Sequence, residues 1–235
     1  MIEQVTLRDG TDAFVVPLER TDRATLAAEF DSLSPESQRR RFLAPVRHLS
    51  DAMLAHLVDD VDGTNHIALV LCAETSPDVY DPIALARLVR YTDASEAADL
   101  AVTVKDAWQG RGVASVLLSV LMRRRPAGVH RIVTEVLRDN PASLAMLRRL
   151  GPLSLRDGGS GVYSVVVELE SAPAEPPAEP PAEPATGAAT DAAAPAGRPA
   201  PVTGPPEEAR TPALVGDSQQ RHALRTRDQV CPWFD

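Results

Sequence analysis

Apolar residues in the first quarter of the chain recur at helical spacing in short segments, and each segment follows a residue that can cap a helix. The pattern predicts helices that begin at Thr21 or Asp22, at Ser34 and at Ser50. Pro35 falls in the first turn of the second helix, where its missing N–H leaves no hydrogen bond unmade. A single strand over 12–19 is expected before them, so the chain opens with one strand and a group of helices.

The period then changes from helical spacing to the alternation typical of strands. Three strands in succession are expected over 66–74, 82–91 and 98–105, and no helix separates them, so they most simply form an antiparallel meander. Further elements are expected in this order: a helix to about Arg124, a strand over 131–137, a helix that starts at Asn140 and is ended by Gly151, and a closing hairpin around Gly158 and Gly159. This order predicts an α+β domain with a mixed sheet, formed by an antiparallel meander and one parallel crossover and flanked by helices.

The composition changes sharply at residue 171. Of the 21 prolines in the 235 residues, 13 fall in 171–235, together with AEPP repeats and few large apolar side chains. Such a stretch cannot bury enough apolar surface to offset roughly 1 to 2 kcal/mol of backbone entropy per residue. We therefore expect one folded domain over 1–170, a disordered Pro/Ala/Glu-rich linker over 171–216, and a tail over 217–235 that is either a short docking peptide or a frayed terminus.

Charge and apolar content narrow the possible partners. The formal net charge is -9, and neither the domain nor the tail has the basic excess of a nucleic-acid-binding protein. No run of about 18 apolar residues and no export signal is present, which predicts a cytoplasmic protein that does not enter a membrane. The two cysteines fit a reducing compartment, and the histidines lack metal-ligand spacing, so no metal is expected. The oligomeric state, monomer or homodimer, stays open.

The turn QGRGVA, residues 109–114, lies between the strand over 98–105 and the helix that follows it. Gly110 and Gly112 permit backbone conformations in which several amides face one ligand, and the first N–H groups of the helix add partial positive charge. A pyrophosphate fits that environment, and Gln109 and Arg111 are positioned to add to its binding. A dinucleotide fingerprint is disfavoured because Ser115 occupies its third glycine position, and a Walker loop is excluded because no GKS or GKT occurs.

Gln109-x-x-Gly112-x-Ala114 resembles the coenzyme A-binding signature of the GNAT superfamily of N-acetyltransferases. The resemblance extends over roughly 10–170 and includes AVTVKDAWQGRGVASVLL, NPASLAMLRRLG and LSPESQRRRF, the last of which is similar to the opening helices of bacterial protein lysine acetyltransferases. It implies that acetyl-CoA is the co-substrate and that the strand backbone pairs with the pantetheine arm. The cofactor-binding residues that it implies, together with the turn itself, are Val102, Thr103, Val104, Gln109, Gly110, Arg111, Gly112, Val113, Ala114, Asn140 and Ser143. Asn140 is equally well explained as a helix cap.

Acetyl transfer needs a route for the proton that leaves the amine. Protein lysine acetyltransferases of this superfamily often place a glutamate in a motif like AExA, and the matching residue here is Asp99, with Glu135 on the next strand as a second candidate base. The family's usual tyrosine acid, seven residues after the asparagine, is replaced by Leu147. The expected function is therefore acetyl transfer to a primary amine, either a protein lysine or a small amine. The alternative is an acyl-CoA-binding regulatory module with weak turnover.

Overall fold

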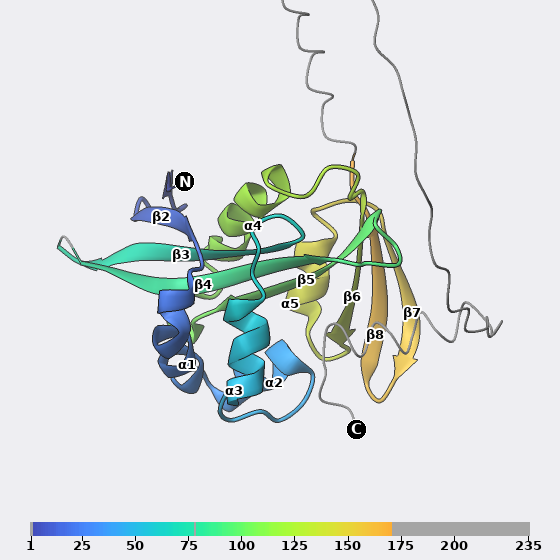
Figure 1. Cartoon of the computed structure of the whole chain (residues 1–235), viewed down its shortest axis with the longest axis horizontal. Helices are drawn as coiled ribbons and strands as arrows, with labels where there is room; N and C mark the ends of the chain where they lie inside the picture. The colour runs from blue at the N-terminus through green and yellow to red at the C-terminus, as the bar shows by residue number, and fades with distance from the viewer. Residues whose placement is uncertain (1, 78, 171–235) are drawn as a thin grey trace, which may run out of the picture. The chain divides into compact units, whose positions relative to one another are not determined.

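The structure is a computed structural model that describes residues 2–77 and 79–170. Its centre is an eight-stranded sheet in the order β1-β2-β3-β4-β5-β6-β8-β7 (Figure 1). The strands are β1 (Glu3–Thr6), β2 (Asp12–Pro17), β3 (His66–Ser76), β4 (Val79–Arg90), β5 (Ala97–Val104), β6 (Arg131–Leu137), β7 (Leu153–Gly159) and β8 (Val162–Glu168).

Every neighbouring pair of strands is antiparallel except β5 and β6, which run parallel. The mixed sheet, the meander of β3 to β5 and the single crossover are those expected from the sequence. The edge strand β1 was not predicted, because four residues are too few to show an alternating pattern. It is recognisable only from its pairing with β2.

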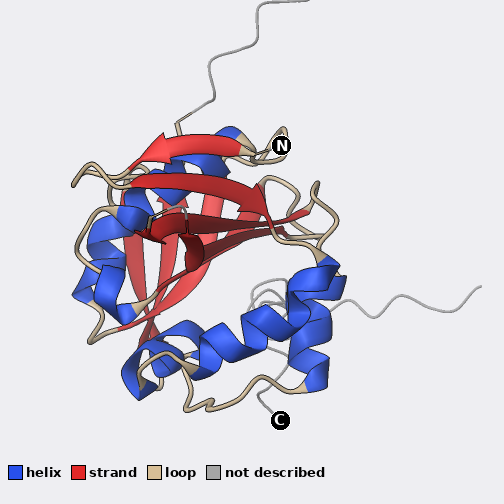
Figure 2. Ribbon diagram, turned by 90° about the vertical axis from the view of Figure 1, so that its left-hand side faces the viewer, coloured by secondary structure: helices blue, strands red, loops and turns tan. Residues whose placement is uncertain are grey.

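Helices cover both faces of the sheet (Figure 2). The N-terminal helices α1 (Arg23–Asp31), α2 (Pro35–Phe42) and α3 (Asp51–Leu54), together with the short turns η1 (Arg20–Asp22) and η2 (Ala55–Asp59), enclose one apolar core with the sheet. The turn η3 (Asp106–Trp108) precedes α4 (Val113–Arg123), which packs on the opposite face and shares a second core with α5 (Pro141–Leu147). Within the described residues, no helix is both long and apolar enough to cross a bilayer.

Two boundaries differ from the sequence expectation. The helix α5 ends at Leu147, and Gly151 has a different role: a Cβ there would lie 2.0 Å from the carbonyl oxygen of Glu168, so only glycine permits this approach to β8. The final hairpin turns at Ser160 and Gly161, two residues later than expected, because Gly159, Ser160 and Gly161 all have positive φ.

Candidate active site

Strands β5 and β6 separate soon after they meet. Their parallel pairing consists of Ala97↔Arg131 and Ala98↔Ile132 and goes no further. Beyond it, the Thr134 hydroxyl of β6 donates to the carbonyl of Leu100 on β5 over 3.2 Å. Past Leu100, the edge of β5 that faces β6 has no strand partner, and unpaired backbone groups are costly unless something else satisfies them.

The turn between β5 and α4 adopts the conformation that its glycines predict. Gly110 and Gly112 both have positive φ, at 76° and 85°, and Gly112 is the N-cap residue of α4. Residues other than glycine rarely adopt this region. Successive amides in such a turn, followed by the unpaired N–H groups of a helix start, form a concave anion site.

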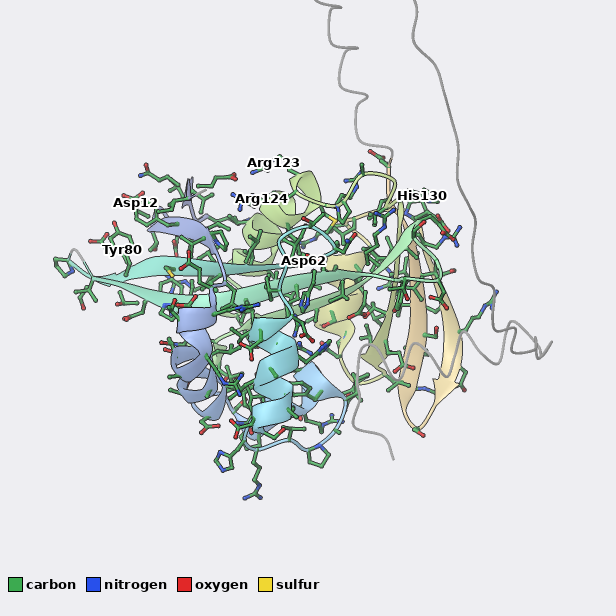
Figure 3. All side chains as sticks on the ribbon, viewed as in Figure 1. Asp12, Asp62, Tyr80, Arg123, Arg124 and His130 are labelled. Carbon is green, nitrogen blue, oxygen red and sulfur yellow. The ribbon has the colours of Figure 1, made fainter. Side chains whose placement is uncertain are left out.

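A cleft of about 380 Å³ joins this turn to the open edge of β5. It includes all but one of the residues assigned to cofactor binding from the sequence, and the exception is Arg111. Four arginines line the cleft, namely Arg8, Arg40, Arg41 and Arg149. Among the described residues, no carboxylate lines it. Arg123 and Arg124 lie at the far end of α4, where both side chains pair with Glu3 of β1 (Figure 3). The cleft is therefore cationic and suited to phosphate groups.

Arg111 and Arg8 differ in a way that the sequence did not indicate. The Arg111 guanidinium pairs with Asp9 and stacks 4.0 Å from the centre of the Trp108 ring, so its charge is already compensated. Hydrogen bonds from Thr11 and Arg111 lower the pKa of Asp9 to about 2, which keeps the carboxylate ionised. Arg8 has no hydrogen-bond or ion-pair partner among the described residues, and its side chain lies directly over Gly112.

Gln109 points toward the N-terminal helices. Its side-chain amide donates to the Ser37 hydroxyl of α2 and to the carbonyl of Val104, each over 3.1 Å. Asp106 accepts hydrogen bonds from Ser34 and Ser37 at the start of the same helix. Burial opposes ionisation of Asp106, but these hydrogen bonds outweigh it and lower its pKa. The segment after β5 therefore anchors α2 beside the cleft. Because Val104 is engaged by Gln109 and Leu100 by Thr134, Val102 is the better-placed backbone partner for a ligand on this edge, while Thr103 pairs with β4.

Asn140 caps a helix and also lines the cleft. Its side-chain oxygen accepts from the Ser143 N–H and its amide donates to the Ser143 hydroxyl over 2.8 Å, so it caps α5. Both residues also line the cleft, on the side opposite β5. A ligand contact at Asn140 therefore has to share a side chain that the helix cap already uses.

Asp99 is buried, with 6% of its surface exposed, on the sheet face that the N-terminal helices cover. Burial raises the pKa of its carboxyl, opposed by a hydrogen bond from Thr134 and by the charges of Arg41 and Arg87. Asp99 does not line the cleft itself, whereas Arg41 does. A proton would therefore have to reach Asp99 through an intervening group or water.

A buried polar cluster continues from Asp99 along the same face. Arg87 of β4 is only 4% exposed, contacts the Nε2 atom of His66, and has no hydrogen-bond partner for its Nε atom. Burial lowers the pKa of Arg87 to about 9 and that of His66 to about 3, so His66 is neutral at pH 7. The described residues contain no group of three or more His, Cys, Asp or Glu arranged to hold a metal ion.

The other two catalytic positions considered from the sequence lie in contrasting environments. Glu135 is exposed on β6, opposite Ser164 of β8, and is not part of the cleft lining. Leu147 is 1% exposed and packs in the core beneath α4. The cleft lining holds no tyrosine in the described part of the chain, so the usual acid for a leaving thiolate is not present there.

Comparison with known proteins matches this geometry. A family model described as an acetyltransferase (GNAT) domain matches residues 13–152. The crystal structure of the GNAT domain of S. lividans PAT superposes with a TM-score of 0.60 at 30% sequence identity, covering 72% of this chain and 97% of that chain. A GNAT-family acetyltransferase from Streptococcus pneumoniae shares the fold, with a TM-score of 0.52 at 14% identity over 67% of this chain and 99% of that chain.

Two curated relatives are larger than the region they share with this chain. Acetyltransferase Pat of Mycolicibacterium smegmatis is 36% identical over 147 residues, which are 61% of this chain and 42% of the relative. Acetyltransferase PA5475 of Pseudomonas aeruginosa is 27% identical over 117 residues, which are 50% of this chain and 61% of the relative. The chain thus spans about two fifths of the first and three fifths of the second.

Proposed function

Because the chain belongs to the GNAT acetyltransferase family, we propose that it transfers an acetyl group from acetyl-CoA to a primary amine by direct attack. The neutral amine attacks the thioester carbonyl carbon, a C–N bond forms, and the C–S bond breaks. The nitrogen loses one proton to a base, and the coenzyme A thiolate leaves and takes up a proton from water. No covalent intermediate on the protein is required.

The observation that carries this proposal is the unpaired edge of β5 next to the Gly110 and Gly112 turn. The backbone of Val102, on the open edge of β5, suits the amides of the pantetheine arm, which would bind as an added strand. The turn, the N-terminus of α4 and the cleft arginines suit the phosphates. The residues present therefore fit the pantetheine arm and the phosphates of coenzyme A.

Asp99 is the base in this proposal. Its raised pKa makes it a stronger proton acceptor than an exposed aspartate, and its burial requires that a water molecule or an intervening side chain connect it to the amine. Glu135 is the weaker candidate because it is exposed and lies outside the cleft lining.

A protein lysine is the acceptor that we favour. The resemblance of 33–42, which includes α2, to the opening helices of protein lysine acetyltransferases supports it. The buried Leu147 in the usual position of the tyrosine acid supports a second candidate, an acyl-CoA-binding module with weak turnover.

Release of free thiol from acetyl-CoA, measured with a panel of small amines and lysine-containing peptides, tests the proposal. We expect release with at least one lysine peptide, at a rate well above hydrolysis without acceptor. Tight binding of acetyl-CoA without release to any acceptor would favour the regulatory module, and no binding at all would overturn both candidates.

Replacing Arg8 with alanine should weaken acetyl-CoA binding about 10-fold to 100-fold, since a hydrogen bond to a charged group contributes about 1.5 to 3 kcal/mol. Arg111→Ala is the matched control, because Arg111 is already paired with Asp9, and it should change the dissociation constant less than about threefold. Isothermal titration gives both dissociation constants.

Titration of Arg8→Ala with acetyl-CoA, acetyl-dephospho-CoA and acetylpantetheine identifies the phosphate that Arg8 binds. If the variant binds both acetyl-CoA and acetyl-dephospho-CoA more weakly than wild type does, but binds acetylpantetheine equally well, Arg8 contacts the pyrophosphate. Equal effects of the two alanine variants would contradict the role of Arg8.

A further inference from the structure

A second cavity, of about 230 Å³, lies between the N-terminal helices and the sheet. Its walls come from α1, α2 and η2 on one side and from β2 to β5 on the other. The lining is largely apolar and includes Leu26, Phe30, Leu57, Val70 and Leu85. For comparison, an apolar cavity of about 150 Å³ is large enough to bind benzene.

This cavity adjoins the coenzyme A cleft. Thr103 of β5 and Arg41 of α2 line both spaces, so the two are separated by no more than these residues. Alternation along β5 places the Thr103 side chain on the same sheet face as Asp99, which is the cavity side. A chain that extended from the cleft past Thr103 on this face would enter the cavity.

The charges around the cavity disfavour an ammonium group inside it. Of the two acids in the lining, Glu29 pairs with Lys105, and Asp22 accepts a hydrogen bond from the Glu19 N–H over 2.8 Å but keeps its charge. Arg41 adds a positive charge where the cavity meets the cleft. A cationic amine would lose its hydration among these apolar side chains, whereas an uncharged hydrocarbon chain would gain apolar contacts.

We propose that this cavity receives the acyl chain of acyl-CoA donors longer than acetyl-CoA, up to about six to eight carbons. The inference rests on the proposed function and extends its donor class. The transfer is balanced as for acetyl: the amine nitrogen bonds to the acyl carbon, the C–S bond breaks, the nitrogen loses a proton, and the thiolate takes one from water.

Chain-length profiles of binding and turnover test the proposal on the full-length protein. Titration and thiol release with acetyl-, butyryl-, hexanoyl-, octanoyl- and dodecanoyl-CoA should show affinity rising by at least about tenfold from acetyl to hexanoyl, because each buried methylene favours binding. Affinity and turnover should both fall again with dodecanoyl-CoA, because its acyl chain is too long for the cavity. Affinity and turnover that decline steadily from acetyl to hexanoyl would overturn the proposal.

Two variants that fill the cavity from opposite walls locate the chain. Val70→Phe on β3 and Leu26→Trp on α1 should each remove the higher affinity for hexanoyl-CoA over acetyl-CoA. The affinity for acetyl-CoA itself should stay within about twofold of wild type. Because α1 is half-exposed at Leu26, the second variant serves if the first fails to fold. Val79→Phe is the control: it makes the same exchange on β4, where Val79 is 48% exposed, and should leave the whole profile unchanged.

The outcomes separate this inference from the proposed function. If acetyl-CoA is bound and used while hexanoyl-CoA is not, the acetyltransferase stands and the cavity assignment fails. If both filling variants raise the KM of the amine equally for every donor, the cavity holds the acceptor and the inference is wrong. If acetyl-CoA itself does not bind, the proposed function fails first.

Discussion

Replacing Asp99 with asparagine is expected to lower kcat for amine acetylation by at least about 100-fold, the usual lower bound for loss of a general base. Asparagine keeps the shape of the side chain, but it cannot take up a proton. Acetyl-CoA should bind the variant with little change, since Asp99 lies outside the cleft lining. Steady-state thiol release and titration measure the two quantities separately.

The pH dependence of the wild type follows from the direction of the Asp99 pKa. Burial raises this pKa, so the carboxyl becomes protonated at a higher pH than an ordinary aspartate. The base acts only when ionised, and activity is therefore lost as the pH falls through the raised value. We expect an acid limb in the kcat profile at a pH above the ordinary aspartate pKa of 3.8, and we expect that limb to be absent in Asp99→Asn.

Glu135→Gln provides the matched control, because it makes the same chemical change on the neighbouring strand at an exposed residue. We expect its kcat to stay within about threefold of wild type. Full activity of Asp99→Asn at every pH would show that Asp99 is not the base, and a large loss in Glu135→Gln would transfer that role to Glu135.

Gly112→Trp is expected to weaken acetyl-CoA binding by at least about 100-fold. Gly112 has a φ of 85°, and a Cβ at this position would lie 2.9 Å from Cδ of Arg8, so the indole must displace the arginine and occupy the cleft. The left-handed conformation costs other residues about 1 to 2 kcal/mol, and relaxing it would turn the amides away from the phosphates. Loss of the Arg8 contact adds about 1.5 to 3 kcal/mol.

Gly110→Ala separates backbone strain from obstruction. Gly110 has a similar φ of 76°, but a Cβ there meets no atom within 4 Å. We expect its acetyl-CoA affinity to fall less than about tenfold. Thermal melts of both variants check that the domain still folds, and undiminished binding by a folded Gly112→Trp would mean that the cleft is not the coenzyme A site.

Local patterns were sufficient to predict much of the fold. Alternating apolar residues identified the three strands of the meander, since side chains on successive strand positions point to opposite faces. Two glycines one residue apart identified the turn, because its backbone needs positive φ at both positions. By contrast, Gly151 suggested a helix end, and only the structure shows that it is required by the nearby Glu168 carbonyl.

The cleft shows where such reasoning ends. The sequence indicated Arg111 because it lies inside the turn, yet the structure pairs it with Asp9, 102 residues away. Arg8 comes from the turn between β1 and β2, and no local pattern connects it with Gly112. The family resemblance indicated Asp99 on the strand before the turn, but the sequence did not show whether Asp99 lines the cleft or lies beneath it.

The sequence by itself determined the order of strands and helices, the glycine turn before α4, and the absence of a tyrosine at position 147, because each depends on residues close together in the chain. Only the tertiary structure decided which arginine is available to a phosphate, how deeply Asp99 is buried, and that an apolar cavity adjoins the cleft. Charge compensation, desolvation and cavity shape depend on groups brought together from distant positions, and these are set by packing rather than by local spacing.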